Sequence, residues 1–215
     1  MKTALITGGS KGIGYGIAEA LIRENWQIAI TGRTKAVLDT AVGNLNALAP
    51  GSAMGIVCDV RDFSAQQQAV EQVTAQFGGI DLLVANAGIG FFAPIDLLDI
   101  DQWKETIDTN LTGVFYSVKA CLESLKARKG YIITISSLAG TNFFQNGSAY
   151  NASKFGVTGF TQAAMLDLRK YGIRVSTIMP GSVATEFSGH EINEDRKSTR
   201  LNSSHIPLSR MPSSA

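Results

Sequence analysis

Short apolar runs alternate along the chain with longer segments that are apolar on one side. The short runs are rich in Val, Ile and Leu, which is typical of strands covered on both faces. They predict six strands: Ala4–Thr7, Gln27–Thr31, Ala53–Cys58, Leu82–Ala85, Tyr131–Ile135 and Val175–Met179. Helix-length segments lie between them: Ile13–Glu24, Lys35–Leu48, Ser64–Phe77, Asp101–Lys126 and Ala149–Lys170. This alternation predicts an α/β protein in which a doubly wound parallel sheet lies between two helical layers.

The end of the chain departs from this pattern. From Asp195 to Ala215 there is no glycine, no aromatic residue and no periodic apolar face, and serines accumulate. A polar segment of this kind is interpreted as a disordered tail. A more specific interpretation is a non-native tail, because the run resembles a translated sequencing adapter that replaces the native C-terminus. Residues 1–194 are therefore predicted to form one domain, and residues 195–215 are not part of it.

The composition limits the kinds of binding partner that we expect for the protein. The net charge is +1, so nothing favours nucleic acid or an anionic membrane. Cys58 and Cys121 lie in separate apolar runs without metal-ligand spacing, which predicts buried, reduced thiols and no metal site. The first apolar stretch stops at Thr7, short of the ~7–15 residues of a signal-peptide core, and the chain is expected to be cytoplasmic.

A glycine-rich turn connects the first predicted strand to the first predicted helix, with the sequence Thr7-Gly8-Gly9-Ser10-Lys11-Gly12-Ile13-Gly14. The first glycine permits a sharp turn, the second lets backbone approach a pyrophosphate, and the third lets the helix pack on the strand. Because helix N-termini attract phosphate, the turn predicts dinucleotide binding.

The second predicted strand ends at Gly32-Arg33. Sites that prefer NAD usually place a carboxylate here for the ribose 2′-hydroxyl, whereas a guanidinium suits the 2′-phosphate of NADP. Lys11 adds a second positive charge on the glycine-rich turn. The alternative, that both are ordinary surface cations, stays open, and NADP is favoured.

Tyr150 and Lys154 are spaced by four residues at the start of a predicted helix, so they share one face. A neighbouring ammonium favours the phenolate and lowers the pKa of a tyrosine, which would let the pair transfer a proton to or from oxygen. Ser137 follows the fifth predicted strand at the sheet edge where such proteins bind ligands. One interpretation is that its hydroxyl holds the substrate oxygen. The alternative is that it only forms hydrogen bonds with backbone groups at the strand end.

Taken together, these motifs resemble the short-chain dehydrogenase/reductase family, a Rossmann-fold family, over residues 1–194. The resemblance implies the catalytic residues Asn110, Ser137, Tyr150 and Lys154. It implies cofactor contacts from Gly8, Ser10, Lys11, Gly12, Ile13, Gly14, Arg33, Asp59, Val60, Asn86, Ala87, Gly88, Pro180, Gly181, Val183 and Thr185, together with Tyr150 and Lys154.

The resemblance also implies a mechanism. NADPH would transfer hydride to a carbonyl carbon while Ser137 holds the oxygen and Tyr150 protonates it. Lys154 would bind the nicotinamide ribose and lower the pKa of Tyr150, and Asn110 would hold a water that links Lys154 to solvent. Within the family the chain is most similar to 3-oxoacyl-acyl-carrier-protein reductases. The resemblance implies a homodimer or homotetramer for the full-length protein.

Several alternatives remain at this stage. One alternative is a dinucleotide-binding protein that has no catalytic activity. A second is a sugar-nucleotide epimerase, although epimerases have a different glycine spacing. A third is an inactive fragment of the enzyme, because the family's C-terminal strand and helix are missing. The substrate cannot be read from the sequence. Aromatic residues in the loops after the fourth, fifth and sixth strands would form an apolar mouth or would only pack: Phe91, Phe92, Phe143, Phe144 and Phe187.

Overall fold

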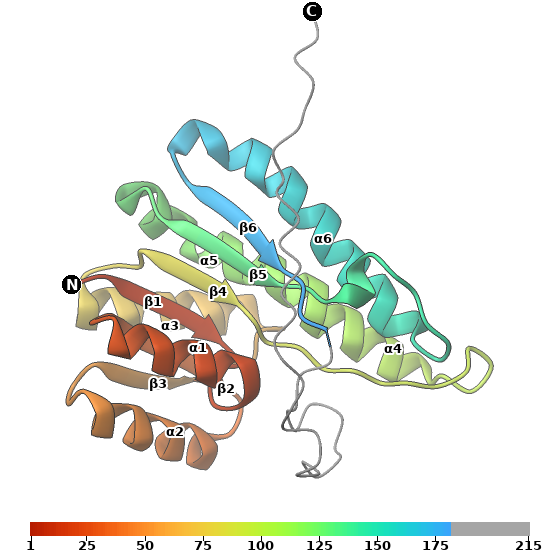
Figure 1. Ribbon diagram of the computed structural model, residues 1–215, viewed down its shortest axis with the longest axis horizontal. Coiled ribbons are helices and arrows are strands. Elements are labelled where there is room, and N and C mark those ends of the chain that lie inside the picture. Colours follow the sequence, from red (N-terminus) through yellow and green to blue (C-terminus); the bar gives the residue numbers. More distant parts are fainter. Residues whose placement is uncertain (182–215) are drawn as a thin grey trace, which may run out of the picture.

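A computed structural model describes residues 1–181 of the protein and shows one parallel sheet of six strands (Figure 1). The strands lie in the order β3-β2-β1-β4-β5-β6. Their bounds are Thr3–Thr7 (β1), Gln27–Gly32 (β2), Ala53–Val57 (β3), Leu82–Ala85 (β4), Tyr131–Ile135 (β5) and Arg174–Ile178 (β6). All five pairings are parallel, as the alternation of apolar runs predicts.

Helices cover both faces of the sheet. Their bounds are Gly12–Arg23 (α1), Lys35–Leu48 (α2), Phe63–Phe77 (α3), Ile100–Ile107 (α4), Gly113–Arg128 (α5) and Ser148–Leu168 (α6). Two short 3-10 turns occupy Leu138–Gly140 (η2) and Arg169–Tyr171 (η3). The doubly wound three-layer prediction is therefore confirmed for the described part of the chain.

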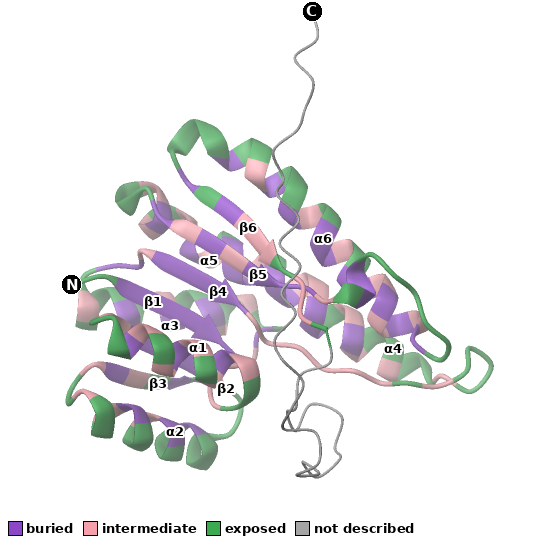
Figure 2. Ribbon diagram, viewed as in Figure 1, coloured by how far each residue is buried: buried purple, intermediate pink, exposed green. Residues whose placement is uncertain are grey.

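The core consists of two main clusters, one on each face of the sheet. Alternate residues of a strand point to opposite faces, so Leu5 and Leu83 pack with α3, α5 and α6, whereas Ile6 and Val84 pack with α1 and α2. Figure 2 shows β1 and β4 buried along their whole length, which explains their nearly continuous apolar sequences.

The predicted helix Asp101–Lys126 is wrong in one respect, because the structure divides it. A five-residue π-helical turn, Asp108–Thr112 (η1), separates α4 from α5. The side chain of Asn110 in this turn binds the backbone of Ile89, in the loop after β4, at both its N–H and its carbonyl, each at 2.8 Å. These long-range hydrogen bonds accompany the wider turn and have no counterpart in the local helical periodicity.

Both cysteines are buried and free, as predicted. Burial raises the pKa of Cys58 to about 11 and that of Cys121 to about 12, so both thiols stay protonated at neutral pH. Residues 1–181 contain no helix long and apolar enough to cross a membrane. The same residues hold no group of three or more side chains suited to a metal ion.

Candidate active site

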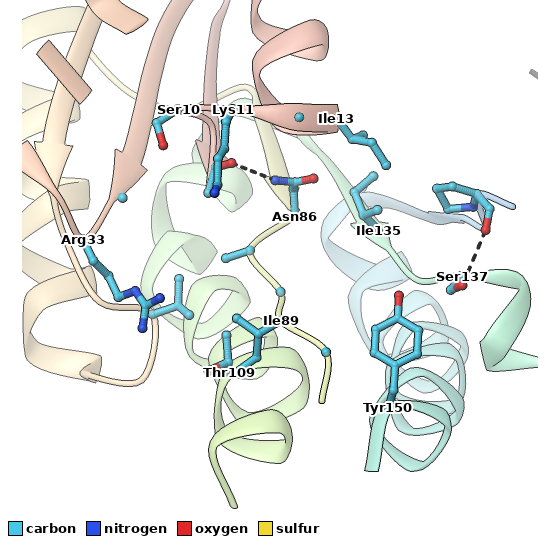
Figure 3. Close-up of a pocket in the computed structure, with 18 of the residues that line it drawn as sticks. Ser10, Lys11, Ile13, Arg33, Asn86, Ile89, Thr109, Ile135, Ser137 and Tyr150 are labelled. Carbon is cyan, nitrogen blue, oxygen red and sulfur yellow. Dashed lines mark hydrogen bonds between the residues drawn. The ribbon is translucent and has the colours of Figure 1, made fainter. Parts of the chain in front are cut away.

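A cavity of 770 Å³ lies at the carboxyl edge of the sheet. It opens where the strand order reverses, between β1 and β4, which is where open α/β sheets bind their ligands. Loops that follow five strands supply its walls, from Gly8 after β1 to Ser137 after β5, and Pro180 lies beyond the end of β6. Figure 3 shows Arg33 and Tyr150 at opposite ends of this cavity.

The glycine-rich turn has the geometry that the sequence predicts. Gly8 and Gly12 have φ values of +62° and +59°, a backbone conformation that favours glycine. A Cβ on Gly8 would lie 2.9 Å from the Cα of Ala87, so a side chain would collide with the loop after β4. The side chain of the N-cap residue Lys11 makes no capping hydrogen bond in the described part of the chain, which leaves backbone N–H groups of α1 for an anion. These features fit a dinucleotide phosphate group.

Gly14 has a packing role rather than a place in the cavity lining. Its hypothetical Cβ would lie 2.5 Å from Nδ2 of Asn86. Asn86 donates through this atom to the carbonyls of Thr7 and Gly8, at 2.9 and 3.0 Å. The absent side chain at Gly14 therefore lets Asn86 connect the glycine-rich turn to the loop after β4.

The other predicted residues of these two loops line the cavity: Ser10, Lys11, Gly12, Ile13, Asn86, Ala87 and Gly88. Thr7 holds the loops together, because its Oγ1 accepts hydrogen bonds from the backbone N–H groups of Asn86 and Ala87 at 3.0 and 3.1 Å. The role of this buried hydroxyl was not predicted, since a threonine at a strand end carries no distinctive sequence signal.

Arg33, Asp59 and Val60, which are predicted to contact the cofactor, line the end of the cavity away from Tyr150. Asp59 accepts hydrogen bonds from the Arg61 guanidinium, with Nη2 to Oδ2 at 2.6 Å. These bonds hold the pKa of the Asp59 carboxyl below its usual value. Arg61 also lies 3.3 Å from Glu105, which in turn lies 3.6 Å from Arg33. Arg61 and Glu105 were not predicted, because Glu105 is far from Arg33 along the chain and no local sequence pattern connects them.

Asn110 is fully buried and lies behind the cavity wall. Besides Ile89, its Nδ2 donates to the hydroxyl of Ser153 at 3.0 Å. A Cβ on Gly88 would lie 3.3 Å from Oδ1 of Asn110 and 3.7 Å from Nζ of Lys154, so the loop, the π-helical turn and α6 meet at one point. Asn110 therefore positions the loop after β4 against α6.

Ser137, Tyr150 and Lys154 meet at the other end of the cavity. The Tyr150 hydroxyl points toward Ser137 (Figure 3), with which it forms a hydrogen bond. Lys154, one helical turn after Tyr150, is 4% exposed and donates from Nζ to the carbonyl of Ile135 at 2.9 Å. Its Nζ lies 5.6 Å from the centre of the Tyr150 ring.

The pKa of Tyr150 moves in the direction opposite to the sequence prediction. Burial raises this pKa, and the hydrogen bond with Ser137 offsets only part of the rise. Burial also lowers the pKa of Lys154 to about 8. For Tyr150 and for Lys154, the free energy needed to move the charged form out of water exceeds the stabilisation from nearby groups. Tyr150 therefore keeps its proton at neutral pH.

Aromatic rings border Tyr150. The ring centroid of Phe92 lies 5.5 Å and that of Phe144 lies 6.5 Å from the Tyr150 centroid, and Phe91 and Phe92 line the cavity. Phe143 is 88% exposed, which excludes a core role for it.

Pro180 and Gly181, at the end of the described chain, also line the cavity that contains Ser137. The Pro180 carbonyl accepts a backbone hydrogen bond from Leu138 at 3.0 Å, which joins the segment after β6 to η2. Val183, Thr185 and Phe187 lie outside the described residues, and so does the predicted tail. The prediction that the family's C-terminal strand and helix are missing also concerns this part of the chain.

The fold and the position of the cavity define a doubly wound α/β protein with a ligand site at the point where the strand order reverses. A family model described as "short chain dehydrogenase" matches residues 2–197, and the chain belongs to this family. Its members transfer hydride between a nicotinamide cofactor and small alcohol or carbonyl compounds.

Individual relatives support this assignment. The chain is 38% identical to trans-4-hydroxycyclohexanecarboxylate dehydrogenase of Sinomonas cyclohexanicum, over 87% of this chain and 74% of that protein. It is 31% identical to the 3-oxoacyl-acyl-carrier-protein reductase FabG of Salmonella typhimurium, over 98% of this chain and 84% of that one. The solved alcohol dehydrogenase of the archaeon Thermococcus sibiricus superposes with a TM-score of 0.85 at 30% identity, covering 90% of this chain and 82% of that one.

Proposed function

We propose that the protein is an NADP-dependent carbonyl reductase that uses Ser137, Tyr150, Lys154 and Asn110. The main support for this proposal is the Tyr150 hydroxyl, which faces Ser137 inside the cavity (Figure 3). Lys154 follows Tyr150 by one turn of α6 and also lines the cavity. When bound, NADPH supplies the hydride, and the protein supplies the proton and the alignment.

The chain's own residues define the proton step. The Ser137 hydroxyl donates a hydrogen bond to the carbonyl oxygen and orients it toward Tyr150. Tyr150 transfers its hydroxyl proton to the same oxygen, so hydride and proton together yield the alcohol. Because burial raises the pKa of Tyr150, the residue holds this proton at neutral pH, which suits reduction.

The buried residues around Tyr150 hold its position. Lys154 is tied to Ile135 at the end of β5 and places a positive charge under the proton donor, which stabilises the phenolate left by proton transfer. Asn110 fixes the loop after β4, which carries Gly88 and Ile89 along the cavity.

Two features support NADP over NAD. The cavity has the guanidinium of Arg33 where a carboxylate would favour NAD, and Lys11 lies in the same lining. The similar alcohol dehydrogenase of Thermococcus sibiricus was solved with 5-hydroxy-NADP. The phosphates would be held by Gly8, Gly12 and the N-terminus of α1. The nicotinamide end would contact Pro180 and Gly181, together with Val183 and Thr185, which lie beyond the described residues.

Arg33→Ala tests the cofactor preference. We expect the variant to bind NADPH about tenfold or more weakly, because one charge-assisted contact is worth ~1.5–3 kcal/mol, while NADH binding hardly changes. Dissociation constants measured by fluorescence titration decide this, and equal losses for both cofactors would show that Arg33 is structural.

A catalytically silent dinucleotide-binding protein is the alternative. Purified protein mixed with NADPH and a panel of ketones separates the two, because only the reductase oxidises NADPH in step with alcohol formation. Tight NADPH binding without turnover on any ketone would favour the silent protein or an inactive fragment.

A further inference from the structure

Four charged side chains form a chain of ion pairs at the end of the cavity away from Tyr150. Their order is Arg33, Glu105, Arg61, Asp59, with N–O distances of 3.6, 3.3 and 2.6 Å along the series. Arg33 and Asp59 line the cavity. Each positive group therefore has a carboxylate beside it, and the four charges cancel.

Glu105 occupies the position between the two guanidinium groups. It lies on α4, which follows β4, whereas Arg33 follows β2 and Arg61 follows β3. Its side chain is 33% exposed, so solvent only partly screens its charge. Arg61 is held by Asp59 through Nε and Nη2, at 3.0 and 2.6 Å, and is thus the less available of the two arginines.

Arg33 is held more loosely. Its 3.6 Å distance to Glu105 exceeds that of a charge-assisted hydrogen bond, and its side chain is 57% exposed. A phosphate monoester carries a larger negative charge than a carboxylate and accepts two parallel hydrogen bonds from a guanidinium. An incoming 2′-phosphate would therefore compete with Glu105 for Arg33.

We propose that Glu105 is a specificity-determining residue that limits the preference for NADPH over NADH. Its carboxylate pairs with Arg33 in the free protein and repels a 2′-phosphate in the complex. NADH has no 2′-phosphate, so its binding does not meet this competition. The inference rests on the proposed function, since it takes Arg33 to be the 2′-phosphate partner.

Glu105→Gln keeps the size of the side chain and removes its charge. We expect this variant to bind NADPH about three- to tenfold more tightly, the range expected for one partly screened charge a few ångströms away. NADH binding should stay within about twofold of the wild-type value, since its 2′-hydroxyl carries no charge for Glu105 to repel. Dissociation constants come from calorimetric titration of the whole chain, without any substrate. Unchanged or weaker NADPH binding overturns the proposal.

Glu123→Gln is the matched control. Glu123 also forms an ion pair on a helix surface, with Lys126 at 2.8 Å, and its loss changes the net charge equally. Its partner Lys126 does not line the cavity, whereas Arg33, the partner of Glu105, does. A similar gain in NADPH affinity from Glu123→Gln would trace the effect to overall charge and overturn the proposal.

The double variant Arg33→Ala, Glu105→Gln separates this inference from the cofactor proposal. If Glu105 acts through Arg33, its replacement gains less NADPH affinity in the Arg33→Ala background than in the wild-type protein. If Glu105→Gln increases NADPH affinity equally in both backgrounds, Glu105 does not act through Arg33 and the proposal is overturned. Failure of Arg33→Ala alone to weaken NADPH binding instead overturns the NADP proposal, whatever Glu105→Gln does.

Discussion

In the proposed mechanism, Tyr150 exchanges a proton with a molecule in the cavity. Its hydroxyl faces Ser137 and its ring contacts Phe92, so burial and one hydrogen bond set its pKa. A phenol in such a setting is neutral near pH 7 and serves as an acid.

Tyr150→Phe tests this role. The variant lacks only the hydroxyl, so we expect carbonyl reduction to slow by ~10²–10⁴-fold while NADPH binding stays nearly intact. Steady-state turnover and a separate binding titration measure the two effects. Tyr171→Phe, a change at a 39% exposed tyrosine outside the cavity, serves as the control. A Tyr150→Phe protein that keeps about a third or more of wild-type turnover would rule out proton transfer by this residue.

Lys154 makes stability depend on pH. Its pKa falls from 10.5 in the unfolded chain to about 8 in the folded protein because burial disfavours the ammonium. Between these values the unfolded state binds more protons than the folded state. The free energy of unfolding therefore rises with pH across this window, and below pH 8 the cost of burying the charge is present in full.

Lys154→Met removes this contribution, since methionine does not titrate. We expect the wild-type protein to gain up to about 3 kcal/mol over the variant as the pH rises from below 8 toward 10.5. Denaturant unfolding of both proteins at the two ends of this range measures the gain. A pH-independent difference would show that the Lys154 pKa is not lowered by burial.

At the scale of the element, α1 depends on where its glycines lie. Gly14 is buried against Asn86, whereas Gly16, two residues later, is exposed, and a Cβ there would meet no other atom within 4 Å. One glycine thus permits a close contact between two loops, and the other only lowers helix propensity.

Gly14→Ala and Gly16→Ala should therefore act in opposite directions. We expect Gly14→Ala to destabilise the protein by ~1–3 kcal/mol and to weaken NADPH binding, because Asn86 must move. Gly16→Ala should stabilise it by ~0.5–1 kcal/mol, since alanine loses less backbone entropy in a helix. Thermal unfolding of both variants provides the comparison. Stabilisation by Gly14→Ala would mean that the Asn86 contact is dispensable.

The whole sheet brings the site together. β1 lies between β2 and β4, so the loops after these three strands, which carry Gly12, Arg33 and Asn86, meet along one cavity. β5 and β6 add the end that holds Ser137 and Pro180. Assembly into a homodimer or homotetramer stays a prediction at this scale.

Deletion of residues 195–215 tests the proposed domain boundary. Because this segment has the composition of a polar tail, we expect its removal to change the free energy of unfolding by no more than ~0.5 kcal/mol. Deletion of residues 174–215 is the contrasting variant, since it also removes β6 and its pairing with β5. A loss of ~2 kcal/mol or more in the free energy of unfolding on deletion of residues 195–215 would mean that this segment is a folded part of the domain. That outcome would agree with the alignment with the Salmonella reductase, which extends over 98% of the chain.

The sequence alone determined the order of elements and the local motifs. Apolar runs of strand length predicted all six strands, and the three glycines predicted the turn before α1, because both signals depend on residues close together in the chain. The spacing of Tyr150 and Lys154 placed both on one face of α6, since a helix returns to the same face about every four residues.

Only the tertiary structure decided how these parts act on one another. Asn110 in the π-helical turn forms hydrogen bonds with Ile89, 21 residues away, and Glu105 on α4 reaches Arg33 in the loop after β2. The pKa of Tyr150 depends on the burial that neighbouring elements impose, which outweighs the hydrogen bond from Ser137. Desolvation and long-range ion pairs are set by whichever atoms the fold packs around a group, and local periodicity does not specify those atoms.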